Sequence, residues 1–111
     1  MIIKLFEYLK DNGADVYFVG QHKGECKSPY IVLKDDGTSS LNGKTGTSLI
    51  DVLFFIPQNN FTKCESYKNS IKEIIKQFGK VRYTGTETGI VVDDEKKALT
   101  FSVMYEFYKK L

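Results

Sequence analysis

The sequence has little of the residues on which most catalytic and metal sites depend. Its 111 residues include one histidine, His22, two cysteines and no tryptophan. A catalytic triad or a multi-histidine metal site would have to be built on that single imidazole. His22, Cys26 and Cys64 could supply three zinc ligands, but no C-x-x-C pair brings them together. We therefore expect no enzyme, no cofactor and no metal.

Long apolar runs and a strong charge of one sign are missing too. No apolar stretch approaches the roughly 20 residues of a membrane span, and the start of the chain lacks the apolar core of a signal peptide. We therefore expect an intracellular protein with reduced thiols and no membrane partner. The net charge of +2 is too small for the basic face that duplex DNA binding requires.

The residues that are present predict one domain, spanning 1–111. Hydrophobic residues make up 41% of the chain, with 7 Tyr and 8 Phe among them. Such a chain can form a core, but a domain of this size buries only about two thirds of its unfolded surface. We expect part of the aromatic surface to be covered by neighbouring copies.

Hydrophobic periodicity predicts two helices. Ile2, Leu5, Phe6 and Leu9 recur at helical spacing before the stop Asn12-Gly13. A second helix is expected from Thr62, which with Glu65 has the pattern of a capping box, to Gly79. Its apolar stripe is Tyr67, Ile71, Ile74, Ile75 and Phe78, and its lysine stripe is Lys68, Lys72 and Lys76.

β-Branched and aromatic runs predict the strands, at 15–20, 29–34, 49–56, 81–83 and 90–92 and from Ala98 onward. The run at 49–56 is nearly all apolar, which favours a central strand. The last strand alternates, with Phe101 and Val103 on one side and Met104 and Tyr108 on the other. The fold class is therefore α+β, a mixed, mostly antiparallel sheet of four to five strands with two helices packed on one face.

The polar segment 37–48 has one large apolar side chain, Leu41, and so has almost nothing to bury. We expect a mobile loop that orders on contact with a partner. It contains Gly43-Lys44-Thr45, but the spacing from Gly37 does not fit a phosphate-binding loop and no helix follows.

For three further groups of residues, a role in chemistry or binding is possible, but an ordinary structural role is favoured. Lysines 23 and 27 could activate the Cys26 thiol, but the sequence supplies no partnered base. Asp93, Asp94 and Glu95 form an acidic turn that is more typical of solvated charge than of a cation site. The lysine stripe could face nucleic acid, although a solvated helix face is the ordinary interpretation.

Six stretches carry a resemblance that lies in their order and spacing and covers most of the chain beyond Gly20. They are 26–33, 51–57, 67–71, 84–87, 92–98 and 102–111. Together they resemble the tail terminator, or tail completion, proteins from the head-to-tail joining region of long-tailed bacteriophages and prophages, also called minor capsid proteins.

The resemblance implies a structural protein that forms a ring, commonly a hexamer, on the finished tail tube. The ring would end tail polymerisation and join the tail to the head connector, with DNA only passing through its lumen. The protein would act in the host bacterial cytoplasm during assembly and then in the neck or tail of the virion. The candidate contact residues are Leu41, Asn42, Lys44, Thr45, Met104 and Tyr108, and the candidate lumen residues are Lys68, Lys72 and Lys76.

Two alternatives stay open. A head-side connector or stopper protein of the same neck region has a similar size. A small nucleic-acid-binding module would use the lysine stripe and exposed tyrosines, and its affinity would fall steeply with salt.

Overall fold

A computed structural model describes residues 1–40 and 42–110. Within this part of the chain, two α-helices, a short 3-10 helix and six strands follow one another. They are α1 (Ile2–Asp11), β1 (Val16–Phe18), β2 (Tyr30–Ser39), β3 (Thr45–Pro57), η1 (Phe61–Lys63), α2 (Cys64–Phe78), β4 (Arg82–Glu87), β5 (Val91–Asp93) and β6 (Ala98–Lys110). The α+β class is confirmed, but the sheet has six strands rather than four to five.

The sheet is mixed and mostly antiparallel, in the order β1-β2-β3-β6-β4, with β5 also paired to β6. Among the described strands, only the pairing of β1 with β2 is parallel. The central strand is β3, as its apolar sequence predicted, and it pairs with β6 along its whole length of 13 residues. These two strands form the centre of the sheet.

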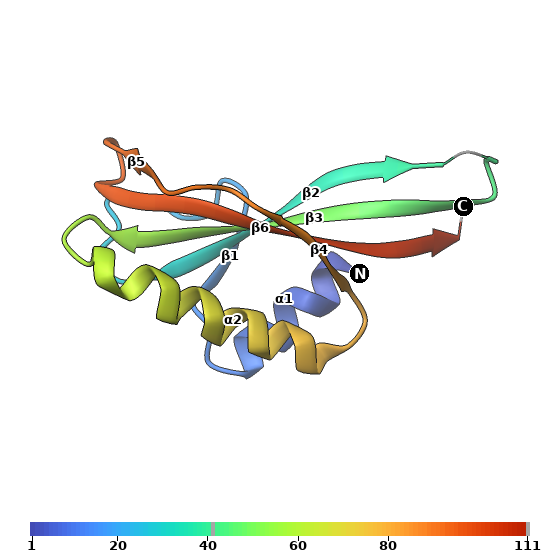
Figure 1. Cartoon of the computed structure of the whole chain (residues 1–111), viewed down its shortest axis with the longest axis horizontal. Helices are drawn as coiled ribbons and strands as arrows, with labels where there is room; N and C mark the ends of the chain where they lie inside the picture. The colour runs from blue at the N-terminus through green and yellow to red at the C-terminus, as the bar shows by residue number, and fades with distance from the viewer. Residues whose placement is uncertain (41, 111) are drawn as a thin grey trace.

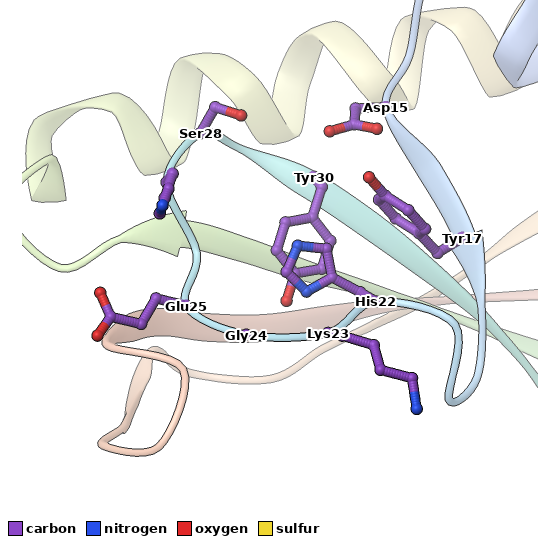
Figure 2. Close-up of a pocket in the computed structure, with 9 residues that line it drawn as sticks. Asp15, Tyr17, His22, Lys23, Gly24, Glu25, Ser28 and Tyr30 are labelled. Carbon is purple, nitrogen blue, oxygen red and sulfur yellow. The ribbon is translucent and has the colours of Figure 1, made fainter.

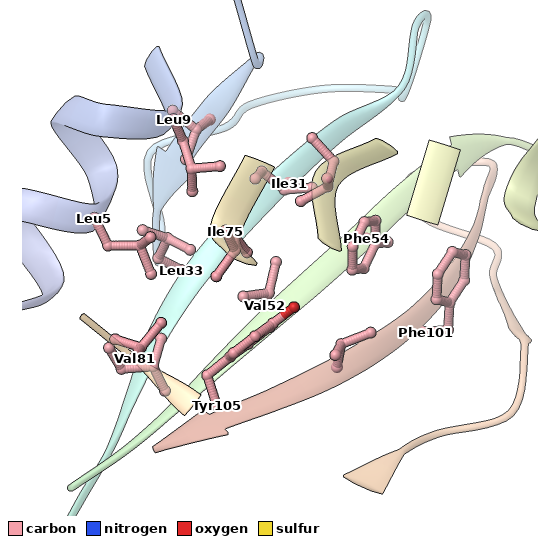
Figure 3. Close-up of a cluster of buried hydrophobic side chains, with 14 of the residues drawn as sticks. Leu5, Leu9, Ile31, Leu33, Val52, Phe54, Ile75, Val81, Phe101 and Tyr105 are labelled. Carbon is pink, nitrogen blue, oxygen red and sulfur yellow. The ribbon is translucent and has the colours of Figure 1, made fainter. Parts of the chain in front are cut away.

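Both helices cover the same face of the sheet, below it in Figure 1. Leu5 and Leu9 of α1 and Ile71 and Ile75 of α2 are buried against the strands, as the periodicity of both segments predicted. Figure 3 shows Leu5, Leu9 and Ile75 beside the strand residues of this core. The strand residues of this core include Ile31, Val52, Phe54, Phe101, Val103 and Tyr105.

A second, smaller cluster lies on the opposite face of the sheet. Tyr30, Val32, Ala98 and Cys26 are its buried members. Cys64 belongs to the core on the helix side, so the two cysteines are buried in separate clusters and both are free thiols. This agrees with the expectation of reduced cysteines.

The predicted capping box at the start of α2 is wrong. Thr62 lies inside the 3-10 turn Phe61–Lys63, and the N-cap of α2 is Lys63, which makes no side-chain capping bond. The helix does end at Gly79, whose φ of 73° is the left-handed conformation that glycine favours.

Candidate assembly surface

Three strands of the sheet continue past the helices. In Figure 1, β2, β3 and β6 run to the right beyond both helices and give the molecule a long projection. The longest extent is 47 Å against 25 Å in the other two directions. We call residues 34–39, 45–51 and 104–110 the distal sheet. Its cross-strand partners include Ser39 with Thr47 and Thr47 with Tyr108.

The distal sheet occupies most of the segment that was expected to be a loop. Strand β2 continues to Ser39 and β3 begins at Thr45, so of the described residues only Ser40 and 42–44 lie between the two strands. The Asn42 side chain accepts hydrogen bonds from the backbone N–H groups of Lys44, at 2.8 Å, and Thr45, at 3.0 Å. These bonds form locally, which is how a segment with little to bury takes a defined shape. The mobility of the segment stays a prediction.

The tip of the distal sheet gathers three of the six predicted contact residues. Asn42, Thr45 and Tyr108 line one shallow hollow of about 240 Å³. Lys44 is exposed in the turn beside it, whereas Met104 lies farther along β6, opposite Asp51. The sixth candidate, Leu41, lies outside the described residues.

Tyr108 is the most exposed of the large hydrophobic residues that the structure describes, with 72% of its surface accessible. The guanidinium of Arg82 lies 4.4 Å from the centre of its ring and also contacts Glu106 at 3.1 Å. A cation held over an aromatic ring keeps the ring in place without covering its other face. The tip therefore presents an ordered aromatic surface to solvent.

The lysine stripe of α2 differs from both interpretations of its sequence. Lys68 and Lys72 contact the carboxylate of Glu87 on β4, at 2.9 Å and 2.7 Å. Tyr83 also donates its hydroxyl to Glu87. Only Lys76 has an exposed position. Glu65 also contacts Lys68, at 3.1 Å, so two of the three lysines weighed as facing nucleic acid have carboxylate partners within the chain.

The titration behaviour of this cluster follows from its hydrogen bonds. The ammonium of Lys72, the hydroxyl of Tyr83 and the ammonium of Lys68 lower the pKa of Glu87 to about 2. The same carboxylate raises the pKa values of both lysines. No local sequence pattern indicates the cluster, because Glu87 lies far along the chain from both lysines and meets them only through the pairing of β4 with β6.

A second charged group that sequence reasoning missed lies on the open face of the distal sheet. Burial and a hydrogen bond with Asp36 raise the pKa of Asp51 to about 6. One carboxylate oxygen of Asp51, Oδ1, is buried without a hydrogen-bond partner. Lys34 lies 3.4 Å from Asp36. Acidic groups therefore outnumber cations at this point of β2 and β3.

The loop between β1 and β2 folds over the opposite end of the open face. The ring of His22 stacks on Tyr30 at a centroid distance of 3.8 Å, and Tyr17 meets both rings edge-on. Figure 2 shows His22 lying over Tyr30, with Asp15 and Tyr17 beside them. Lys96 donates a hydrogen bond to the backbone carbonyl of His22 at 3.0 Å. The hollow next to this stack measures about 540 Å³.

The single histidine and its neighbouring cysteine have structural contacts in this loop. Burial lowers the pKa of His22 and raises the pKa of Cys26. The Cys26 thiol donates to the backbone carbonyl of Ser28 at 3.3 Å. Cys64 lies on the other side of the sheet, so the three residues weighed as zinc ligands do not converge. Residues 1–40 and 42–110 hold no group of three or more His, Cys, Asp or Glu side chains arranged for a metal ion.

Comparison with known protein families finds no match, and no curated protein is significantly similar to the chain. None of the helices in the described residues has the length and apolar character to cross a membrane.

Proposed function

We propose that this protein is a tail terminator of a long-tailed phage or prophage, a structural subunit that closes into a ring on the tail tube. The observation that carries the proposal is the distal sheet. Three strands extend past the helices and end in an exposed aromatic residue, Tyr108, and a polar turn. A subunit needs such a surface when its neighbours complete it.

The proposed partners are further copies of the chain, as a hexameric ring, together with the tail tube protein and the head connector. The proposed location is the bacterial cytoplasm during assembly and then the neck of the virion. Aromatic residues with little conformational freedom are well suited to such contacts, because ordering them on binding costs little entropy.

Nucleic-acid binding is less favoured as a function. A binding face gains affinity by neutralising phosphates with unpaired lysines. Here Glu87 pairs with both Lys68 and Lys72, and Glu65 also pairs with Lys68, so both ammonium groups have carboxylate partners within the chain. DNA passing through a ring needs no such affinity, so this pairing is compatible with the proposed terminator.

The test is sedimentation and negative-stain imaging of the purified protein, alone and with tail tubes that lack their terminator. Rings that seat on tube ends are the expected result. Tyr108→Ser should reduce ring formation at least about tenfold, because it removes an exposed contact. Phe61→Ser is the matched control, since Phe61 is also largely exposed, at 62%, but lies at the far end of the sheet.

Two results would contradict the proposal. A protein that stays monomeric at every concentration, with and without tail tubes, is not a ring-forming terminator. Rings that bind isolated head connectors but never tail tubes would instead support the head-side stopper.

A further inference from the structure

The distal sheet has a free edge on each side. Strand β1 pairs with β2 only as far as Leu33, and β4 pairs with β6 only as far as Glu106. Among the described strands, none lies against the outer side of 34–39 or of 107–110. Unpaired N–H and C=O groups along such an edge form a template for a strand of another chain.

The two edges carry opposite charge. On the β2 side, Asp36 lies beside Asp51, whose buried Oδ1 has no hydrogen-bond partner, and Asp35 is the neighbour of Asp36 along the strand. One lysine, Lys34, is close enough to pair with Asp36. This side therefore has more carboxylates than cations to meet them.

On the β6 side, Lys109 and Lys110 end the strand, and both are exposed. Lys44 lies next to them, because Thr45 is the cross-strand partner of Lys110. None of these three lysines takes part in an ion pair with the described residues. The β2 edge thus has an excess of carboxylates, and the β6 edge has an excess of ammonium groups.

We infer that copies of the chain join head to tail, with the 107–110 edge of one copy, carrying Lys109 and Lys110, against the 34–36 edge of the next, carrying Asp35 and Asp36. The inference rests on the proposed function and specifies the contact that builds the ring. In this contact, the strand that pairs with each edge comes from another copy of this chain.

Charge decides between this contact and the symmetric ones. Two β2 edges would oppose carboxylates to carboxylates, and two β6 edges would oppose ammonium groups to ammonium groups, which destabilises a strand pair. Strand β2 also carries a bulge between Asp35 and Thr38, with Gly37 at a φ of 91°. Charges and bulges at an edge discourage unselective pairing, so the contact is selective for a complementary edge.

The strand directions allow the contact to repeat. Both β2 and β6 are antiparallel to β3, so they run the same way within one copy. Within one copy, 107–110 begin level with Thr38 and Ser39, farther along the strands than 34–36. Rotation of copies about an axis inclined to the strands supplies this offset and places β6 of one copy alongside β2 of the next, in the same direction. Once the ring closes, this heterologous contact has paired both edges of every copy. Each contact is short, so closure of the ring supplies most of the stability.

Charge reversal tests the contact. One variant carries Asp35→Lys with Asp36→Lys, and the other carries Lys109→Glu with Lys110→Glu. Each variant alone should lose assembly, because its two edges have the same sign. An equimolar mixture should assemble again, with the variants alternating, so native mass spectrometry should find only even-numbered complexes. Far-UV circular dichroism before mixing checks that each variant is folded.

A milder pair and a distant control complete the design. Asp35→Lys and Lys109→Glu as single changes leave Asp36 and its contacts in place. Asp94→Lys with Glu95→Lys makes the same change of charge in the β5–β6 turn, at the other end of the sheet, and should assemble like the wild type. Raising salt from 50 to 500 mM should weaken wild-type assembly about tenfold or more, since exposed charges are screened.

The outcomes separate this inference from the proposed function. If the wild type forms rings but both charge-reversed variants still assemble alone, or their mixture fails to assemble, the edge contact is wrong and the terminator proposal stands. If the mixture assembles as described but no ring seats on a tail tube, the edge contact stands and the terminator proposal fails. A wild type that remains monomeric up to about millimolar concentration overturns the edge contact, given how ring closure strengthens weak contacts.

Discussion

The carboxylate of Glu87 lies 2.7 Å from the ammonium of Lys72 and joins β4 to α2. The contact holds an edge strand of the sheet to the helix below it, and Lys68 adds a second ammonium to the same carboxylate. A charged group shared in this way stabilises the fold only while it is ionised.

Replacing Glu87 by Gln should therefore lower stability in a pH-dependent way. The pKa of Glu87 is lowered to about 2 in the folded chain, so its contribution is complete above the ordinary carboxyl pKa and is lost as pH falls through about 2. We expect a loss of about 1 kcal/mol at pH 7, allowing for solvent screening. Urea unfolding at pH 7 and at pH 2.5 measures it, with Glu7→Gln on α1 as the control. A difference that does not shrink in acid would contradict the assignment.

Replacing Asp51 by Asn should change the pH profile in the opposite sense. Because the pKa of Asp51 is raised to about 6, the folded chain binds more protons than the unfolded chain between about pH 4 and 6. Wild-type stability should therefore fall as pH rises through this window, and Asp51→Asn should remove that fall, worth about 1–2 kcal/mol. Thermal unfolding of both proteins from pH 4 to 7.5 measures the difference. Parallel profiles would show that Asp51 titrates normally.

Replacing Gly46 by Ala should weaken the distal sheet. A Cβ at this buried position would lie 2.7 Å from the backbone carbonyl oxygen of Ser39, a group that cannot move without breaking the hairpin. We expect a loss of about 1–3 kcal/mol, the usual range for overpacking. Gly89→Ala is the matched control, because a Cβ there meets nothing within 4 Å. Urea unfolding compares the two variants. Equal stability would place the backbone at Gly46 farther from Ser39 than the structure has it.

Replacing Phe54 by Ala should remove most of the margin of stability. Phe54 is fully buried on the helix side and stacks on Phe101 at a centroid distance of 4.9 Å. The cavity should cost about 3–5 kcal/mol, a large part of the stability of a domain of this size. Phe55→Ala, one residue along on the partly covered open face, should cost clearly less. Equal losses would mean that the two faces are buried alike.

The parts of the fold that the sequence predicted are those that local pattern determines. The helical spacing of Leu5 and Leu9 and the alternation from Phe101 to Val103 each depend on one element and its own buried face. Thr62 and Glu65 had the spacing of a capping box, but the 3-10 turn at Phe61–Lys63 moves the helix start past Thr62.

The candidate site was less predictable, because its features depend on partners far apart in the chain. Ser39 and Thr47 have no apolar pattern and become strand residues through pairing with β3 and β6. The ion pair between Lys72 and Glu87 likewise depends on how β4 packs against α2. Tyr108 was expected at a contact surface from its place on the outer side of the last strand, and that position is exposed.

The unbroken ladder between β3 and β6 has a mechanical consequence. Because the same two strands pass from the packed body to the tip, the tip cannot hinge independently of the body. A pull on Thr45 or Lys110 is shared by hydrogen bonds that extend back to the layer under the helices. The distal sheet and the body should therefore move as one rigid unit, so that a partner bound at the tip also sets the orientation of the whole subunit.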